Sequence, residues 1–250
     1  MDRFIVLAAR RSGVTLLLDS LSSHPQIQCY KEVFRTRQKF RYFQIDKKHS
    51  HFYKFRSASL KRQIDYILRR KQLLDAFLME LYTPADGIKA TIARLAYLQA
   101  RKYPEIVELA LENDIGIIHL VRENSLKTIA SNISARKRNT HHSTSKVEPV
   151  AIQLSPSKLR KSLTRLTKQI ENYRAVLAGK RHLEVSYESF VAHRDTETRR
   201  ILNFLGVDPS VPLTSDLIKL NPDSLEDILE NYDQVAQALK RTVFEKYLTM

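Results

Sequence analysis

Two cations, two hydroxyl groups and a glycine stand together near the beginning of the chain, as would suit the binding of an anion. They belong to the run Arg10, Arg11, Ser12, Gly13, Val14 and Thr15. An apolar run over residues 4–9 predicts a buried strand before them, and apolar spacing over 14–23 predicts a helix after them. The first N–H groups of a helix attract negative charge, and glycine allows close backbone approach. The run is therefore interpreted as a phosphate-binding loop, with an ordinary strand-to-helix turn as the alternative.

The two most familiar nucleotide-binding patterns are missing. The chain contains no G-x-x-x-x-G-K-[ST], which disfavours an ATPase or GTPase of the usual kind, and no G-x-G-x-x-G. A phosphoryl-transfer enzyme with an atypical loop stays open as an alternative. It would need a magnesium-binding carboxylate after a strand, and both Asp86 and Asp114 precede their expected strands.

A second candidate anion site follows a later strand. Residues 115–121 form a nearly continuous apolar run, Arg122 comes directly after it, and the next helix carries Ser131. Ligands of open parallel sheets bind beyond the carboxyl ends of the strands. Arg122 and Ser131 are therefore expected at the same edge as Arg11, and the two anion sites suggest a ligand with two separated phosphates.

Four segments in order resemble the sulfotransferase family that uses 3′-phosphoadenosine 5′-phosphosulfate (PAPS), especially its bacterial carbohydrate-type members. The loop R-R-S-G-V-T resembles P-[RK]-S-G-T-[TS], and L-V-R-E-N-S-L-K-T-I-A-S resembles the 3′-phosphate motif. Later come V-S-Y-E-S-F-V with I-L-N-F-L-G-V, and the tail L-N-P-D-S-L-E-D-I-L-E-N-Y-D-Q-V. Two positions depart from the family pattern: Arg10 stands where proline is common, and Val14 replaces a hydroxyl residue.

The resemblance implies a reaction and a set of site residues. PAPS would be held by Arg10, Arg11, Ser12, Gly13, Val14, Thr15, Arg122 and Ser131. Arg11 would support the departing phosphate, and Glu32 would take the proton of the acceptor. A sulfuryl group would move by in-line displacement to a hydroxyl of a carbohydrate or glycolipid, leaving 3′-phosphoadenosine 5′-phosphate (PAP). No metal is implied.

Plainer interpretations remain for three of the titratable residues. Without the resemblance, the favoured interpretation of Glu32 is a solvated carboxylate paired with Lys31 or Arg35. His119 is the rival candidate for the base, because histidine ordinarily titrates near neutrality, but its mid-strand position favours a hydrogen-bonded core histidine. Lys89 ends an expected strand and is expected either at the reactive edge or in a structural salt bridge.

The whole chain, 1–250, is expected to form a single α/β domain with a P-loop-like parallel β-sheet flanked by helices on both faces. The expected strands are 3–8, 27–30, 86–90, 115–121 and 182–186. The expected helices are 13–23, 57–82, 104–112, 124–137, 156–178, 195–205 and 223–240. A hydrophobic content of 43% is sufficient for a sizeable core.

Two segments depart from the regular alternation of strand and helix. Residues 35–85 are expected to form a helical insertion on the acceptor side. Within it, residues 35–71 interleave cations with aromatic side chains, which suits either nucleic-acid stacking or a cap that packs its aromatic rings inward. Residues 137–154 are expected to form a mobile loop, and the adjacent histidines in it lack further ligands at metal-binding spacing.

The charge balance is strongly basic and favours polyanionic partners. Lys and Arg number 42 against 27 Asp and Glu, a net charge of +15. The donor, an acidic glycan or an anionic membrane surface all fit; nucleic acid fits the bulk charge but is the less favoured partner. No apolar stretch reaches the ~20 residues of a membrane span, and no signal peptide is recognised. The single Cys29 excludes an internal disulfide, so a cytoplasmic location is expected.

Overall fold

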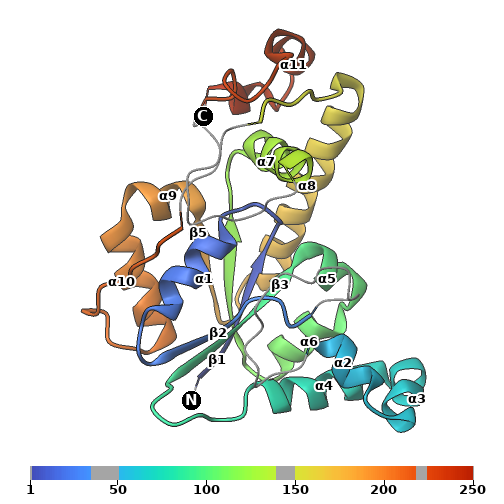
Figure 1. The fold of residues 1–250 in the computed structure, drawn as a ribbon, viewed down its shortest axis with the longest axis vertical. Coiled ribbons are helices and arrows are strands. Elements are labelled where there is room, and N and C mark those ends of the chain that lie inside the picture. The colour runs from blue at the N-terminus through green and yellow to red at the C-terminus, as the bar shows by residue number, and fades with distance from the viewer. Residues whose placement is uncertain (1, 35–50, 139–149, 218–223, 250) are drawn as a thin grey trace.

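The computed structural model describes residues 2–34, 51–138, 150–217 and 224–249. Within them, five parallel strands form one sheet in the order β2-β3-β1-β4-β5 (Figure 1). Their bounds are β1 Asp2–Ala8, β2 Ile27–Tyr30, β3 Ala90–Ala96, β4 Gly116–Val121 and β5 His182–Ser186. β1 is central and apolar throughout its buried part, because both of its faces are covered. The fold class predicted from the sequence is therefore confirmed.

Helices cover both faces of the sheet (Figure 1). One face packs against α1 (Val14–Ser22), α9 (Tyr187–Ala192) and α10 (Arg194–Leu205). The other packs against α2 (Phe52–Ser57), α4 (Arg70–Leu81), α5 (Tyr97–Lys102), α6 (Glu105–Glu112) and the C-terminal half of α8 (Pro156–Leu177). None of the described helices combines the length and the apolar character that crossing a bilayer requires.

A third cluster of buried side chains lies beyond the carboxyl ends of the strands. It joins α7 (Ser125–Arg138), the first half of α8, α11 (Tyr232–Leu239) and the 3₁₀ helix η1 (Glu245–Leu248). Ile152 and Leu229 form an isolated parallel bridge there, and Ile152 is buried. The loop expected over 137–154 is therefore shorter at both ends, because Lys137 and Arg138 belong to α7 and Ile152 belongs to the bridge. Residues 139–149 of this expected loop lie outside the described part.

The strand expected over 86–90 is wrong, because β3 begins only at Ala90. Arg94 interrupts the apolar run of β3, so the hydrophobic pattern did not indicate a strand there. Lys89 therefore lies at the amino end of β3, where its backbone N–H donates to the carbonyl oxygen of Gln26 at 2.9 Å. Since the candidate site lies at the carboxyl ends, the expectation that Lys89 faces the reactive edge is wrong as well.

Two expected helices are broken into shorter pieces. The helix over 57–82 is replaced by α2, α3 (Leu60–Leu68) and α4, because Ser59 and Arg69 adopt non-helical backbone angles. Ser59 caps α3, its side chain accepting a hydrogen bond from the backbone N–H of Arg62 at 3.2 Å. The helix over 223–240 is reduced to α11, preceded by turns. Two short helices that directly follow strands, α5 and α9, were not expected.

Candidate active site

The loop between β1 and α1 has a backbone conformation that strongly favours glycine. Gly13 is the N-cap of α1 with φ +90°, and a Cβ atom at Gly13 would lie 2.1 Å from Cδ2 of Tyr187. Arg11 also has a positive φ, 67°, which is uncommon for a residue with a side chain. Such a conformation persists only where its surroundings hold it, and it is found preferentially at functional sites.

Some side chains of this loop are buried and hold its shape, and others are at least partly exposed. The Ser12 hydroxyl is fully buried and donates to the carbonyl oxygen of Ala9 at 2.9 Å, so it holds the loop in shape. Val14, the first residue of α1, is buried in the core, so an apolar side chain packs where the family pattern has a hydroxyl residue. Arg10 is exposed and Thr15 is half-buried. The first bond of α1 runs from the Leu17 N–H to the Gly13 oxygen, so the preceding N–H groups have no partner inside the helix.

Three residues predicted at separate places in the chain meet beside this loop. Arg11 Nε donates to the Ser131 hydroxyl at 3.2 Å, and Arg122 Nη1 donates to the Arg11 carbonyl oxygen at 3.4 Å. The Arg122 guanidinium also lies 5.0 Å from the centre of the Tyr187 ring. Its Nε is buried without a hydrogen-bond partner among the described residues. A buried donor of this kind is costly unless a ligand satisfies it.

Positive charge is concentrated where these residues meet. Burial, together with the charges of Arg138, Arg122, Arg94 and Arg10, lowers the pKa of Arg11 to about 10. Burial also lowers the pKa of Arg122 from its ordinary value. Crowded, partly desolvated guanidinium groups would be relieved by a bound anion. The residues present therefore fit a ligand that carries phosphate groups.

Glu32 follows β2 and is held by a cation that the sequence did not reveal. Its Oε1 accepts from Arg94 Nη1 at 2.5 Å, and its backbone oxygen accepts from His51 Nδ1 at 2.8 Å. Lys31 pairs instead with Asp19 at 2.9 Å, so the pairing of Glu32 with Lys31 is wrong, and Arg35 lies outside the described residues. The positive charge of Arg94 also lowers the pKa of Arg11, so Arg94 links Glu32 to the cationic cluster.

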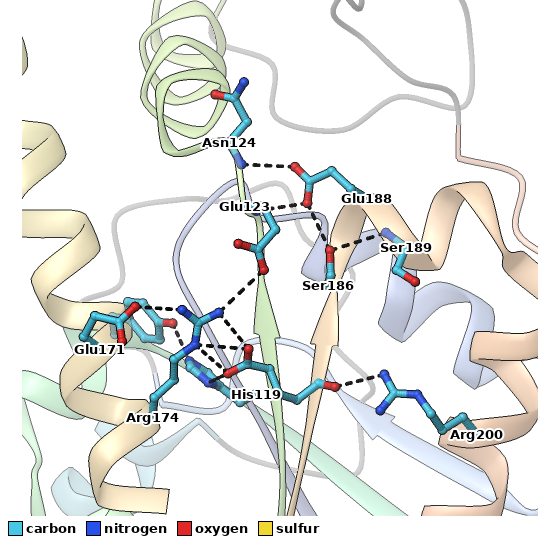
Figure 2. A network of polar contacts seen from close by, with 11 residues as sticks. His119, Glu123, Asn124, Glu171, Arg174, Ser186, Glu188, Ser189 and Arg200 are labelled. Atoms are coloured by element: carbon cyan, nitrogen blue, oxygen red, sulfur yellow. Dashed lines mark hydrogen bonds and ion pairs between the residues drawn. The ribbon is translucent and has the colours of Figure 1, made fainter. Parts of the chain in front are cut away.

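His119 is the core histidine that its position predicted. It is fully buried in β4, with Nε2 2.6 Å from the Tyr97 hydroxyl and Nδ1 3.1 Å from Glu184 Oε2. Burial lowers its pKa despite the attraction of Glu184. Arg174 pairs with Glu184 at 2.7 Å. Figure 2 shows Arg174 extending this network to Glu123 and Glu171. The network connects α8 with β4 and β5 and supports the sheet.

Tyr187 and Glu188, at the start of α9, complete the support of the site. The Glu188 carboxylate accepts from the backbone N–H groups of Glu123 at 3.0 Å and Asn124 at 3.3 Å (Figure 2). These bonds fix the chain directly after Arg122, while Tyr187 packs against Gly13 and Arg122. Sequence reasoning gave neither residue a role, although the segment V-S-Y-E-S-F-V that contains them was one signal of the resemblance.

Comparisons with known proteins identify the family and the fold. The sequence model of the Sulfotransferase family matches residues 3–210. The fold is similar to a sulfotransferase from Alicyclobacillus acidocaldarius, with 16% identity, TM-score 0.50, and coverage of 100% of this chain and 96% of the other. It is also similar to the mouse sulfotransferase SULT7A1 complexed with PAP, with 12% identity, TM-score 0.50, and coverage of 99% and 87%. No curated protein sequence matches. Because the family match spans most of the chain, this protein belongs to the sulfotransferase family.

Proposed function

We propose that Arg11, Arg122 and Ser131, with the backbone of the loop, form the donor site of this sulfotransferase, and that the acceptor is a hydroxyl group of a carbohydrate or glycolipid. PAPS is the sulfate donor of the family. One observation carries the assignment of the donor site. Arg122 donates to the backbone of Arg11 in the left-handed loop, and the Nε of Arg122 is buried without a hydrogen-bond partner among the described residues. A donor with two separated phosphates matches these two cations.

The residues of the site each have a role in this scheme. Bound PAPS supplies a sulfuryl group that passes in line to the acceptor oxygen. Arg11 and the first N–H groups of α1 stabilise the negative charge that grows on the phosphate. Arg122 and Ser131 hold the second phosphate and fix the orientation of the donor. Their positions are set beforehand by Tyr187 and Glu188, so little rearrangement is needed.

Glu32 is proposed as the base for the acceptor hydroxyl. Its carboxylate is partly exposed, 30% of the side chain, and the ion pair with Arg94 holds it in one orientation. An oriented carboxylate near the donor can accept the proton as the sulfuryl group moves. The insertion over 35–85 begins just after Glu32, and His51 returns from it to Glu32. This contact supports the insertion as the acceptor side of the site.

The acceptor class rests on charge. The net charge of +15 favours acidic glycans and lipids with anionic headgroups. The cytoplasmic location stays a prediction based on the single Cys29.

Nucleic-acid binding through the basic insertion finds no support in residues 51–71, while the cations and aromatic side chains of 35–50 lie outside the described residues. Phe52 and Phe55 are buried, and Tyr66 is only partly exposed, beneath the guanidinium of Arg56 at 4.3 Å. Bases stack on exposed aromatic faces, and these described rings do not offer such faces. The burial of Phe52 and Phe55 supports the cap that packs its aromatic rings inward.

Binding of PAP provides the first test of the donor site. Thermal unfolding is measured with PAP, 5′-AMP and ATP for the wild type and for Arg122→Ala, with Arg136→Ala, an exposed arginine on α7, as the control. At 100 times the dissociation constant, PAP should stabilise the native state by about 2.7 kcal/mol. We expect this gain in the wild type and the control, and its loss in Arg122→Ala. Equal stabilisation of all three proteins would contradict the assignment.

A further inference from the structure

The helix α3 presents an apolar stripe to solvent. It buries none of its residues, and Leu60, Ile64, Ile67 and Leu68 are exposed by 72%, 47%, 78% and 74%. Their spacing places the four side chains within an arc of about 100° around the helix. The other large apolar side chains exposed in the described residues are distributed over several elements: Met79, Leu98, Val176, Val191 and Val243. Scattered exposure is ordinary, whereas a contiguous stripe indicates an interaction surface.

The opposite side of α3 is attached to the protein. The Arg62 guanidinium lies 3.8 Å from the centre of the Phe55 ring, and the Tyr66 hydroxyl lies 3.4 Å from that of Tyr103. These contacts hold the polar and aromatic side inward, so the apolar side faces outward. In Figure 1, α3 lies at the outer end of the group formed with α2 and α4, at the periphery of the molecule.

The surroundings of the stripe are strongly basic. Residues 54–70 contain one carboxylate, Asp65, and six cations: Lys54, Arg56, Lys61, Arg62, Arg69 and Arg70. Lys54, Lys61 and Arg69 are exposed, and Lys61 directly follows the first residue of the stripe. An apolar helix face flanked by Lys and Arg is the pattern of helices that lie in the interface of anionic membranes.

We propose that α3 is a docking surface for an anionic lipid bilayer. Leu60, Ile64, Ile67 and Leu68 enter the boundary between headgroups and acyl chains, and the exposed cations contact acidic headgroups. A second copy of the chain is the weaker occupant, because pairing two such surfaces would bring like charges together. Nucleic acid is weaker too, because aliphatic side chains provide no stacking surface for bases.

Vesicle co-sedimentation with the full chain tests this proposal. Vesicles of phosphatidylcholine alone are compared with vesicles that also contain phosphatidylglycerol. The tested variant combines Ile67→Ser and Leu68→Ser, and the matched control combines Val176→Ser and Val191→Ser, which are exposed on α8 and α9. Neither pair is buried, so both variants should fold, and unchanged thermal unfolding checks this.

We expect the wild type and the control to bind the acidic vesicles, with binding that weakens as salt increases. The α3 variant should lose about tenfold or more in partitioning, because the apolar contact is removed. Absence of binding by the wild type, or equal binding by the α3 variant, would overturn the proposal. A wild-type dimer in solution that the α3 variant converts to a monomer would assign the stripe to a second copy instead.

Discussion

Replacement of Gly13 by alanine should disturb both the stability of the protein and its donor site. The new Cβ would lie 2.1 Å from Cδ2 and 2.4 Å from Cε2 of Tyr187. The Tyr187 ring cannot move away freely, because it also packs against Arg122. The substitution therefore forces either the loop or the ring to shift, and each shift displaces a group that we assign to the donor site.

The cost has two parts that a matched variant can separate. A left-handed conformation costs a residue with a Cβ about 1–2 kcal/mol, and overpacking against a ring costs about 1–3 kcal/mol. Gly13→Ala should thus lower the free energy of unfolding by about 2–5 kcal/mol. Gly87 has a similar φ of +74° with nothing within 4 Å of its added Cβ. Gly87→Ala should consequently show only the backbone part, about 1–2 kcal/mol.

Urea unfolding of the two variants gives the comparison, and the difference between them measures the contact with Tyr187. Gly13→Ala should cost less stability in a Tyr187→Ala background than in the wild type, because the clash is then absent. PAP should stabilise Gly87→Ala as much as it stabilises the wild type, and Gly13→Ala much less. Equal losses of stability at Gly13 and Gly87 would refute the packing of Tyr187 on the loop.

Three further predictions concern catalysis, metal and pH. Glu32→Gln should lower turnover by about 10²–10⁴-fold while PAP stabilises it normally, and steady-state kinetics with unchanged turnover would exclude Glu32 as the base. Sulfate transfer should persist in excess EDTA, and a loss that magnesium restores would show that the reaction needs a metal. Because burial holds the pKa of His119 below its ordinary value, the unfolded chain binds the extra proton more readily. The free energy of unfolding should therefore decrease as the pH falls through about 6.5, and urea titrations should show a smaller decrease in His119→Gln.

The elements that the sequence predicted well are those whose environment is uniform. β1 and β4 are apolar over most of their length, because both faces of each strand are covered, and pattern alone was sufficient to find them. The position of Arg122 followed from the end of β4. Its meeting with Arg11 then followed from the general rule that parallel strands present their carboxyl ends at one edge.

The missed features depend on contacts between distant parts of the chain. Arg94 made β3 look interrupted, yet this cation is accommodated because Glu32, 62 residues earlier, accepts its hydrogen bond. The breaks at Ser59 and Arg69 carry neither glycine nor proline, and the N-cap serine at 59 was the one local signal between α2 and α3. Phe55 of α2 and Leu74 of α4 are buried, whereas α3 between them buries no residue, and the local pattern did not predict this division.

The contacts around the proposed donor site link three of the four segments that carried the resemblance. The absent side chain of Gly13 makes room for Tyr187 from the end of β5, and Tyr187 in turn supports Arg122 from the end of β4. Arg122 donates to the backbone of Arg11, whose side chain reaches Ser131 on α7. Each segment thus holds one side of a contact whose other side lies in another segment. A change in any one of them should be felt at the loop, which is why we expect Gly13→Ala to impair PAP binding as well as stability.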